Sequence, residues 1–280
     1  MLGMHVLDLA IVLLIGALGL RTRPTDLLLL FQDRGLGLRA FLALFLFMPA
    51  CTLLAVWALP VEAPIRASLL ALSVAPLAPI LSRARAQAST KGDLMLGLQV
   101  FSALVALVAI PAMLALTETL FDYSTDYPVG TIAWFIIKQI GFPLVAGMGL
   151  ARLLGEHRDR VATWLERFGT VALIGGMLLV LFVVMPTVWD LSINGRLLSV
   201  VVFTALVLVT GRLFGGSDKG IRHGLVMAGA QRHPGVAFVV ATTVLPTDRE
   251  PILVILVLFV LVGTLATIPY MLKRKETDPT

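Results

Sequence analysis

The chain contains 280 residues, of which 58% are hydrophobic and 14% charged, and its mean hydropathy is +0.95. Soluble domains have about 45–50% apolar and about 25% charged residues, so this composition excludes a water-soluble enzyme, a nucleic-acid-binding module and a disulfide scaffold. The formal charge of +5 fits a membrane protein, because cytoplasmic loops are rich in Lys and Arg. Cys51 is the only cysteine, so neither an internal disulfide nor a thiolate metal site is expected.

Nine apolar stretches follow one another along the chain, and each predicts a membrane-spanning helix of about 20 residues. The first has no Lys or Arg before it and no cleavage site, which indicates a retained helix and not a signal peptide. None of the stretches alternates with a period of two, so a β-barrel is not expected. The stretches lie near residues 4–20, 40–59, 66–88, 94–117, 129–151, 168–189, 197–214, 220–245 and 251–271.

The distribution of basic residues predicts the orientation of these spans. The odd-numbered loops and the C-terminal tail hold 17 of the 22 Lys and Arg residues, and the even-numbered loops hold 3. By the positive-inside rule, the N-terminus lies outside the plasma (inner) membrane and the C-terminus lies in the cytoplasm. Residues 1–280 are predicted to form a single domain in the lipid bilayer, with halves at about 1–117 and 129–272.

Two of the predicted spans are interrupted near their middle. Pro76 and Pro79 interrupt the third, and Pro234 and Gly235 interrupt the eighth, because proline removes a backbone donor and disfavours the helix. If the first half lacks its opening helix, spans 1–4 match spans 6–9, and the two broken spans correspond. Paired broken helices at corresponding positions are typical of inverted-repeat transporters, with the breaks meeting near the midplane.

Charged residues at membrane depth are the candidates for function, since they are costly there. Arg232 and His233 lie about twelve residues inside the eighth stretch. Arg83 and Arg85 lie either in the core or in the cytoplasmic loop, and Lys138 either binds a ligand or pairs with a carboxylate. The sequence shows no zinc pair, no phosphate loop and no acidic cluster. We therefore expect no enzyme activity, no cofactor and no metal site.

Several short motifs occur in an order that resembles the bile acid:sodium symporter family. They are Gly-Leu-x-x-x-Pro-x-Asp at 19–26, Met-Pro at 48–49, Lys-Gly-Asp at 91–93, Ile-Pro-Ala at 110–112, a lysine followed by a proline at 137–147, and Gln-Arg-His-Pro-Gly-Val-Ala at 231–237. The resemblance implies a panel domain and a core domain, with the two broken helices crossing in the core. It also implies uptake of organic anions, often with sodium.

The chain departs from the family at the positions expected to bind sodium. The Ser-Asn pair falls on Arg83–Ala84 or Ala84–Arg85, and the next two hydroxyl ligands fall near Gly97 and Phe101. The Glu falls on Ala228 and the Gln on Arg232 or, after a one-residue shift, on Gln231. Sodium needs oxygen ligands, as other hard cations do, whereas a guanidinium supplies a fixed charge and no acceptor.

These observations predict an all-α, nine-span secondary transporter that moves a small organic anion by alternating access. The missing ligands argue against sodium coupling and leave the proton, carried by His233, as the other candidate. A conventional sodium symporter, a passive anion pathway and a transporter fold used as a sensor are the alternatives. Arg232, Arg83 and Arg85 are predicted to bind the anionic group in bidentate geometry, Gln231, His233 and Ser82 to complete the polar shell, Pro76, Pro79, Pro234 and Gly235 to shape the crossing, and Lys138 to bridge panel and core.

Overall fold

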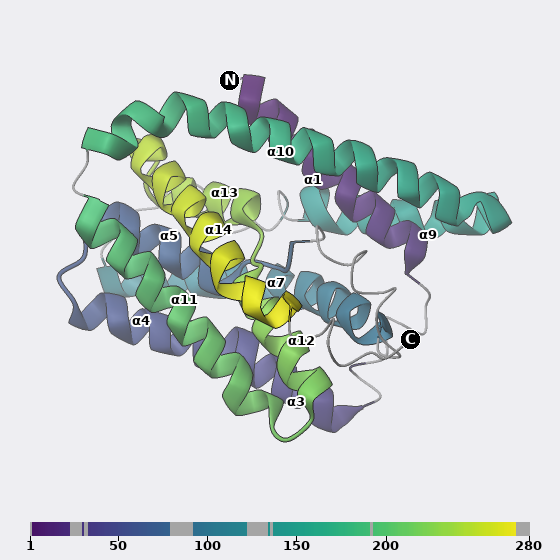
Figure 1. Ribbon diagram of the computed structural model, residues 1–280, viewed down its shortest axis with the longest axis horizontal. Coiled ribbons are helices and arrows are strands. Elements are labelled where there is room, and N and C mark those ends of the chain that lie inside the picture. The colour runs from purple at the N-terminus through teal and green to yellow at the C-terminus, as the bar shows by residue number, and fades with distance from the viewer. Residues whose placement is uncertain are drawn as a thin grey trace.

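The computed structural model describes residues 2–22, 30, 33–78, 92–121, 134, 137–190 and 193–272. Within these residues the regular structure is helical, apart from one isolated antiparallel bridge between Leu77 and Arg232 (Figure 1). The helices lie in the apolar stretches of the sequence. Four predicted site residues, Pro79, Ser82, Arg83 and Arg85, lie outside the described residues.

One group of helices, which we call the three-helix unit, consists of α1 (Leu2–Arg21), α9 (Phe142–Leu154) and α10 (Arg158–Asp190). In Figure 1, α10 runs along the top of the molecule, and α1 lies against it and against α9. Glycines allow the close contact of α1 with α9. A Cβ atom on Gly147 would overlap the backbone oxygen of Gly16 and lie 3.0 Å from Cα of Gly19. This contact and the Arg21–Glu166 ion pair, at 2.9 Å, connect the three helices firmly.

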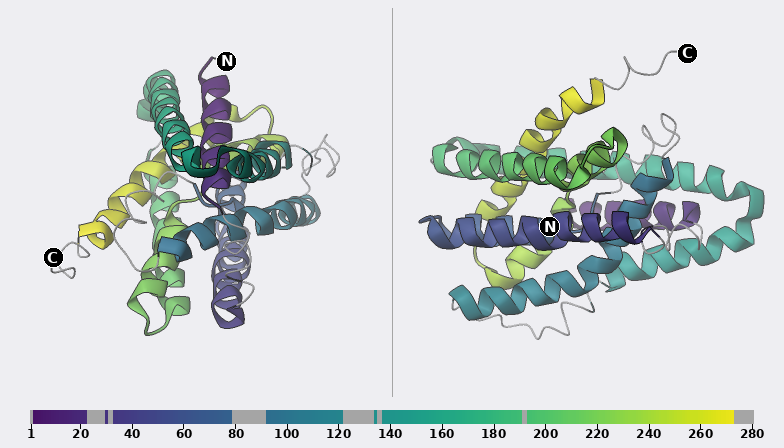
Figure 2. Two further views of the ribbon diagram at one scale, coloured as in Figure 1. Left: turned by 90° about the vertical axis from the view of Figure 1, so that its right-hand side faces the viewer. Right: turned by 90° about the horizontal axis from the view of Figure 1, so that it is seen from below.

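The second group, which we call the central unit, contains the other described helices (Figure 2). Its first rod runs through α3 (Arg34–Phe41), the π-helix η1 (Leu42–Phe47) and α4 (Met48–Ala58). The rest are α5 (Ala63–Val74), α7 (Gly92–Phe121), α11 (Ile193–Gly215), α12 (Lys219–Ala230), α13 (Pro234–Val244) and α14 (Arg249–Leu272). Their buried faces form the main hydrophobic core, which includes Leu72, Leu98, Leu225, Val236 and Ile255.

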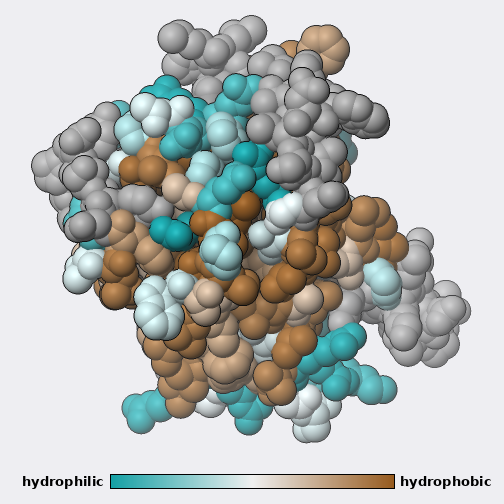
Figure 3. Space-filling view, turned by 90° about the vertical axis from the view of Figure 1, so that its left-hand side faces the viewer, coloured by the Kyte–Doolittle hydropathy of each residue, from teal (hydrophilic) through white to brown (hydrophobic). Residues whose placement is uncertain are grey.

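The described helices have the length and surface of membrane-spanning elements. Five segments are long and apolar enough to cross a bilayer: Arg34–Ala58, Gly97–Phe121, Ile137–Gly176, Gly195–Gly215 and Arg249–Pro269. Large apolar side chains cover their outer surfaces, as Figure 3 shows for one face. Three shorter apolar helices, Leu9–Arg21, Ala63–Val74 and Pro234–Val244, complete the set. Two of these shorter helices end or begin at the interruptions described next.

Candidate functional site at the helix crossing

The third apolar stretch leaves its helix at Val74. Ala75 has extended backbone angles, φ −61° and ψ 146°, and Pro76 next to it lacks the N–H that a further turn would need. A residue before proline is also pushed towards the extended region. The chain therefore continues as a short extended segment through Ala78.

The eighth stretch is interrupted in the same way between α12 and α13. The helix ends at Ala230, residues 231–233 are not helical, and a new helix begins at Pro234. Proline is well suited to a first helical position, because its missing N–H would have no helical partner there. His233 caps the new helix, with its Nδ1 accepting from the backbone N–H of Val236 at 3.4 Å.

The two extended segments, 75–78 and 231–233, pair with each other, and we call this arrangement the crossing. The N–H of His233 donates to the oxygen of Pro76 at 2.8 Å, and the N–H of Ala78 donates to the oxygen of Gln231 at 2.8 Å. Leu77 and Arg232 lie opposite each other between these two bonds. Backbone groups freed by both breaks are thus satisfied within the chain, as burial requires.

The side chain of Arg232 connects the crossing to a third element. It is 1% exposed. Its Nη1 donates to the oxygen of Ala75 at 2.7 Å, and its Nη2 donates to the oxygen of Leu44 at 2.6 Å. The sulfur of Met48 lies 3.6 Å from Nη2, and the guanidinium lies 5.2 Å from the centroid of the Phe45 ring. The guanidinium is therefore surrounded by carbonyl oxygens, a thioether and an aromatic face.

The free oxygen of Leu44 follows from the sequence around Pro49. In the π-helix η1, the N–H of Met48 bonds to the oxygen of Ala43 and not to that of Leu44. The next residue in π-helical register with Leu44 is Pro49, which has no N–H. The oxygen of Leu44 consequently has no helical partner, and Arg232 supplies one.

Two polar residues on α7 complete the crossing, and the sequence analysis did not identify either. Ser102 accepts the N–H of Leu77 at 3.1 Å and donates to the oxygen of Gln99 at 2.8 Å, while Nε2 of Gln99 donates to the oxygen of Ala78 at 3.3 Å. Both side chains are buried. Their signal was present in the sequence, as two polar residues three apart in an apolar helix, one residue from the Phe101 position considered above.

The structure brings some of the predicted residues together and leaves others apart. Pro76, Gln231, Arg232 and His233 meet at the crossing, followed directly by Pro234 and Gly235. A Cβ on Gly235 would lie 2.7 Å from Cδ1 of Ile11, so α13 touches the three-helix unit at this point. Lys138 lies away from the crossing, exposed in the π-helix η3 (Ile137–Gly141) next to α9.

The electrostatic character of the crossing is set by Arg232. Among the described residues, no carboxylate forms an ion pair with Arg232, and no three His, Cys, Asp or Glu side chains gather to hold a metal. The guanidinium Nε also has no hydrogen-bond partner in the described part of the chain. A buried cation held only by dipoles produces a positive potential, which favours an anion nearby.

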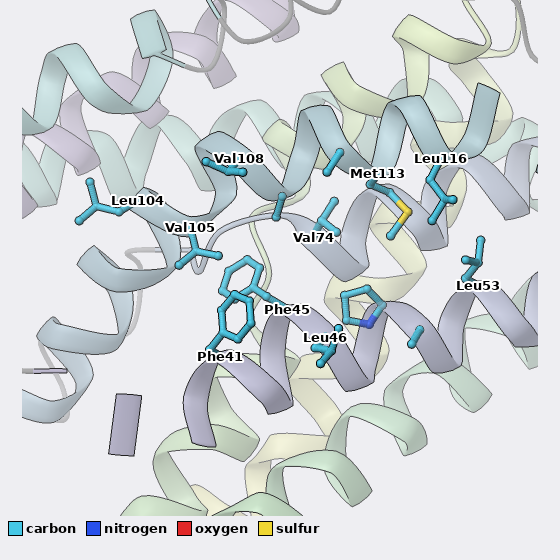
Figure 4. Close-up of a pocket in the computed structure, with 14 residues that line it drawn as sticks. Phe41, Phe45, Leu46, Leu53, Val74, Leu104, Val105, Val108, Met113 and Leu116 are labelled. Atoms are coloured by element: carbon cyan, nitrogen blue, oxygen red, sulfur yellow. The ribbon is translucent and has the colours of Figure 1, made fainter. Parts of the chain in front are cut away.

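A hydrophobic cavity of about 630 Å³ lies on the other side of Phe45 (Figure 4). Phe41 and Phe45 from the first rod of the central unit project into it opposite Leu104 and Val105 of α7. Its lining side chains are all apolar, so the cavity supplies no group that would bind a charge. Phe45 separates this apolar space from the guanidinium.

Comparison with known sequences places the chain in a family. No curated protein matches it. A profile described as the sodium bile acid symporter family matches residues 8–194, which is two thirds of the chain and includes the first broken span. Proteins of this family are membrane transporters and not enzymes, and the apolar helices of the central unit agree with that assignment. The chain therefore belongs to the sodium bile acid symporter family and is an integral membrane transporter.

Proposed function

We propose that the protein carries a small organic anion across the plasma (inner) membrane by alternating access, with Arg232 as a permanent cation at the crossing in place of sodium. The single observation that carries this proposal is the contact of the guanidinium with the oxygens of Ala75 and Leu44. Backbone oxygens of this kind are ligands for hard cations. Here they bind a charge that belongs to the protein.

The surroundings of Arg232 support independence from sodium. Ser102 and Gln99 are engaged with the backbone at Leu77 and Ala78, so their polar groups hold the crossing together. Arg232 supplies one positive charge on the axis between the two breaks, and its desolvation is offset by charge-assisted hydrogen bonds. A sodium ion at the same place would be repelled by the guanidinium.

The anionic group of the substrate is proposed to bind on the positive side of the crossing. The Nε of Arg232 remains as a donor, and Gln231 and His233 flank it in the chain. Ser82, Arg83 and Arg85 are proposed to complete the site from the other broken span. Lys138, which lies beside the three-helix unit, is proposed to meet the substrate from that side during the transport cycle.

The two groups of helices support alternating access as the mode of transport. The three-helix unit is internally tight, because Gly16, Gly19 and Gly147 bring α1 and α9 into backbone contact. Its described contacts with the central unit are fewer and include Gly235 against Ile11. Movement of one rigid group against another around a midplane site is the usual motion of inverted-repeat transporters.

Contacts between helix ends support nine spans with the N-terminus outside. Arg196 pairs with Glu62, and Arg66 lies over the ring of Phe121, and the sequence places all four residues at the outer side. Arg21 pairs with Glu166, and the sequence places both on the cytoplasmic side. Each of these contacts joins ends predicted to lie on the same side of the membrane.

Ligand binding by the purified protein in sodium and in potassium buffer tests the proposal. The probes are taurocholate, pyruvate and methanesulfonate, and the readout is thermal stabilisation, which reaches about 2.7 kcal/mol at 100 times the dissociation constant. We expect equal stabilisation by the bound anion in both buffers. Stabilisation only in sodium would contradict the proposal and indicate a conventional sodium symporter.

Uptake into proteoliposomes separates the remaining alternatives. A carrier shows saturation and competition between unlabelled and labelled anion, and its flux does not require a sodium gradient. Flux that follows the membrane potential without competition would indicate a passive anion pathway. Binding without any flux would indicate a sensor.

A further inference from the structure

A second cavity lies at the predicted outer end of the central unit, away from the crossing. It has a volume of about 340 Å³ and lies between α4, the start of α5 and α11. Thr52, Val56, Leu69, Phe203 and Leu206 line its inner part. Leu59, Pro60 and Val61, together with Glu62 and Ser199, line its outer part. The groove is therefore apolar towards the membrane centre and polar only at its outer end.

Arg196 stands at this polar end and is not fully bonded. Its side chain is 8% exposed, and its Nη2 lies 2.9 Å from Oε2 of Glu62. Its Nε and Nη1 are buried and have no hydrogen-bond partner among the described residues. On α11, Arg196 is followed at helical spacing by Ser199 and Phe203, and both of these line the groove. An arginine with two unused donors is unusual, because buried polar groups are normally paired.

The charges around the mouth favour an anion. Arg66 is next to the groove, with its Nη2 donating to the oxygen of Val61 at 3.4 Å, and Arg196 is the second cation. Glu62 is the acidic partner of Arg196, and 54% of its side chain is exposed. Two guanidinium groups against one carboxylate give this end of the groove an excess of positive charge.

We propose that this groove binds an anionic glycerophospholipid, with the phosphate at Arg196 and an acyl chain between α4 and α11. The shared chemistry of both parts supports this occupant. Guanidinium groups bind phosphate oxygens in bidentate geometry, and the volume lies within the range of ordinary small-molecule sites. The polar-to-apolar direction of the groove matches a lipid whose head lies at the membrane surface. This site is separate from the transport site and does not depend on the function proposed there.

Native mass spectrometry of the delipidated protein with added dioleoylphosphatidylglycerol tests the proposal, with dioleoylphosphatidylcholine as the neutral comparison. We expect the wild-type protein to bind the anionic lipid more tightly. Arg196→Gln should weaken this binding by about tenfold or more, because a charged hydrogen bond is lost. Arg249→Gln, at an exposed position on the same predicted side, is the control and should leave it unchanged.

A second pair of variants keeps the test independent of the ion pair. Ser199→Trp fills the groove without changing any charge, whereas Val201→Trp places the same ring on a part of α11 that does not line the groove. We expect only Ser199→Trp to lose the anionic lipid. Equal binding of both lipids by the wild type, or wild-type binding by Arg196→Gln and Ser199→Trp, would overturn the proposal. Binding of free glycerol 3-phosphate with the affinity of the lipid would overturn the acyl-chain part.

Discussion

Nη2 of Arg232 donates to the backbone oxygen of Leu44 at 2.6 Å, although the two residues are 188 positions apart in the sequence. This bond connects the second apolar stretch of the chain to the eighth. It exists because η1 and Pro49 leave that oxygen without a helical partner. The interaction therefore depends equally on a cation in one half of the protein and on a helix irregularity in the other.

Replacing Arg232 should destabilise the protein. In Arg232→Met, the oxygens of Ala75 and Leu44 stay buried without a donor, and each such group costs about 1–3 kcal/mol. We expect a loss of about 2–6 kcal/mol in the free energy of unfolding, measured by SDS titration in mixed micelles. Arg232→Lys should lose less, because an ammonium restores a charge and one bond but lacks the planar fork. Equal stability of wild type and Arg232→Met would contradict this role.

The site left by Arg232→Ala should accept a cation from solution. The variant leaves a space lined by the oxygens of Ala75 and Leu44, which suits guanidinium and, less well, sodium. We expect guanidinium chloride at millimolar concentration to raise the thermal midpoint of Arg232→Ala and to leave the wild type unchanged. Tetramethylammonium chloride, which has no N–H donor, is the control. An equal response to both salts would show that the effect is only ionic strength.

Ser102 should contribute to the stability of the crossing through the N–H of Leu77. In Ser102→Ala that buried N–H loses its acceptor, and we expect a loss of about 1–3 kcal/mol. Ser199→Ala is the matched control, because the Ser199 hydroxyl bonds only within its own helix, to the oxygen of Gly195. A surface change of that kind should stay within about 0.5 kcal/mol. Similar losses in the two variants would remove Ser102 from the crossing.

The contact between α1 and α9 should be sensitive to a single methyl group. In Gly147→Ala the new Cβ would meet the backbone of Gly16 and Gly19, so the helices must separate, with a loss of about 1–3 kcal/mol. Gly149→Ala, on the same helix, meets nothing within 4 Å and should gain about 0.5–1 kcal/mol, as alanine does over glycine in a helix. Thermal unfolding in detergent compares them. A stable Gly147→Ala would show that the three-helix unit is loosely packed.

The predicted orientation can be tested with single cysteines, because Cys51 is the only native one. In a Cys51→Ser background, Thr247→Cys should react with a membrane-impermeant maleimide added outside intact cells. Glu156→Cys and Lys219→Cys, which are also exposed, should react only after the membrane is opened. The reverse pattern would place the N-terminus in the cytoplasm, and labelling of all three from one side would contradict the span count.

Much of the helical arrangement could be predicted because apolar length and proline position are local signals. The ends of α5 at Val74 and of α12 at Ala230 follow from Pro76 and Pro234, which cannot continue a helix. The start of α10 at Arg158 could not be predicted from hydropathy, since its first turns are polar. Those turns are stabilised by packing of Ala162 against Leu20 and by the pairing of Glu166 with Arg21, both of which are tertiary.

The candidate site was predictable in its residue types but not in its contacts. A buried arginine beside a broken helix indicates function, and the chain does place Arg232 at the crossing. Its partners are backbone oxygens, and nothing in the residue types of Leu44 or Ala75 announces an acceptor. Ser102 was overlooked because its single hydroxyl lies in an apolar helix, where bonding within the helix is the usual outcome.

The pairing of the two broken spans also sets the order in which the protein is made. Ala75 and Arg232 are separated by 157 residues, which a ribosome adds in about 8–30 s at about 5–20 residues per second. Over that interval the first break is already synthesised while its partner strand, and the arginine that satisfies it, do not exist. Completion of the crossing is therefore a late event in biogenesis, and a chain truncated before residue 231 presents open backbone groups at membrane depth to the machinery that removes unfinished proteins.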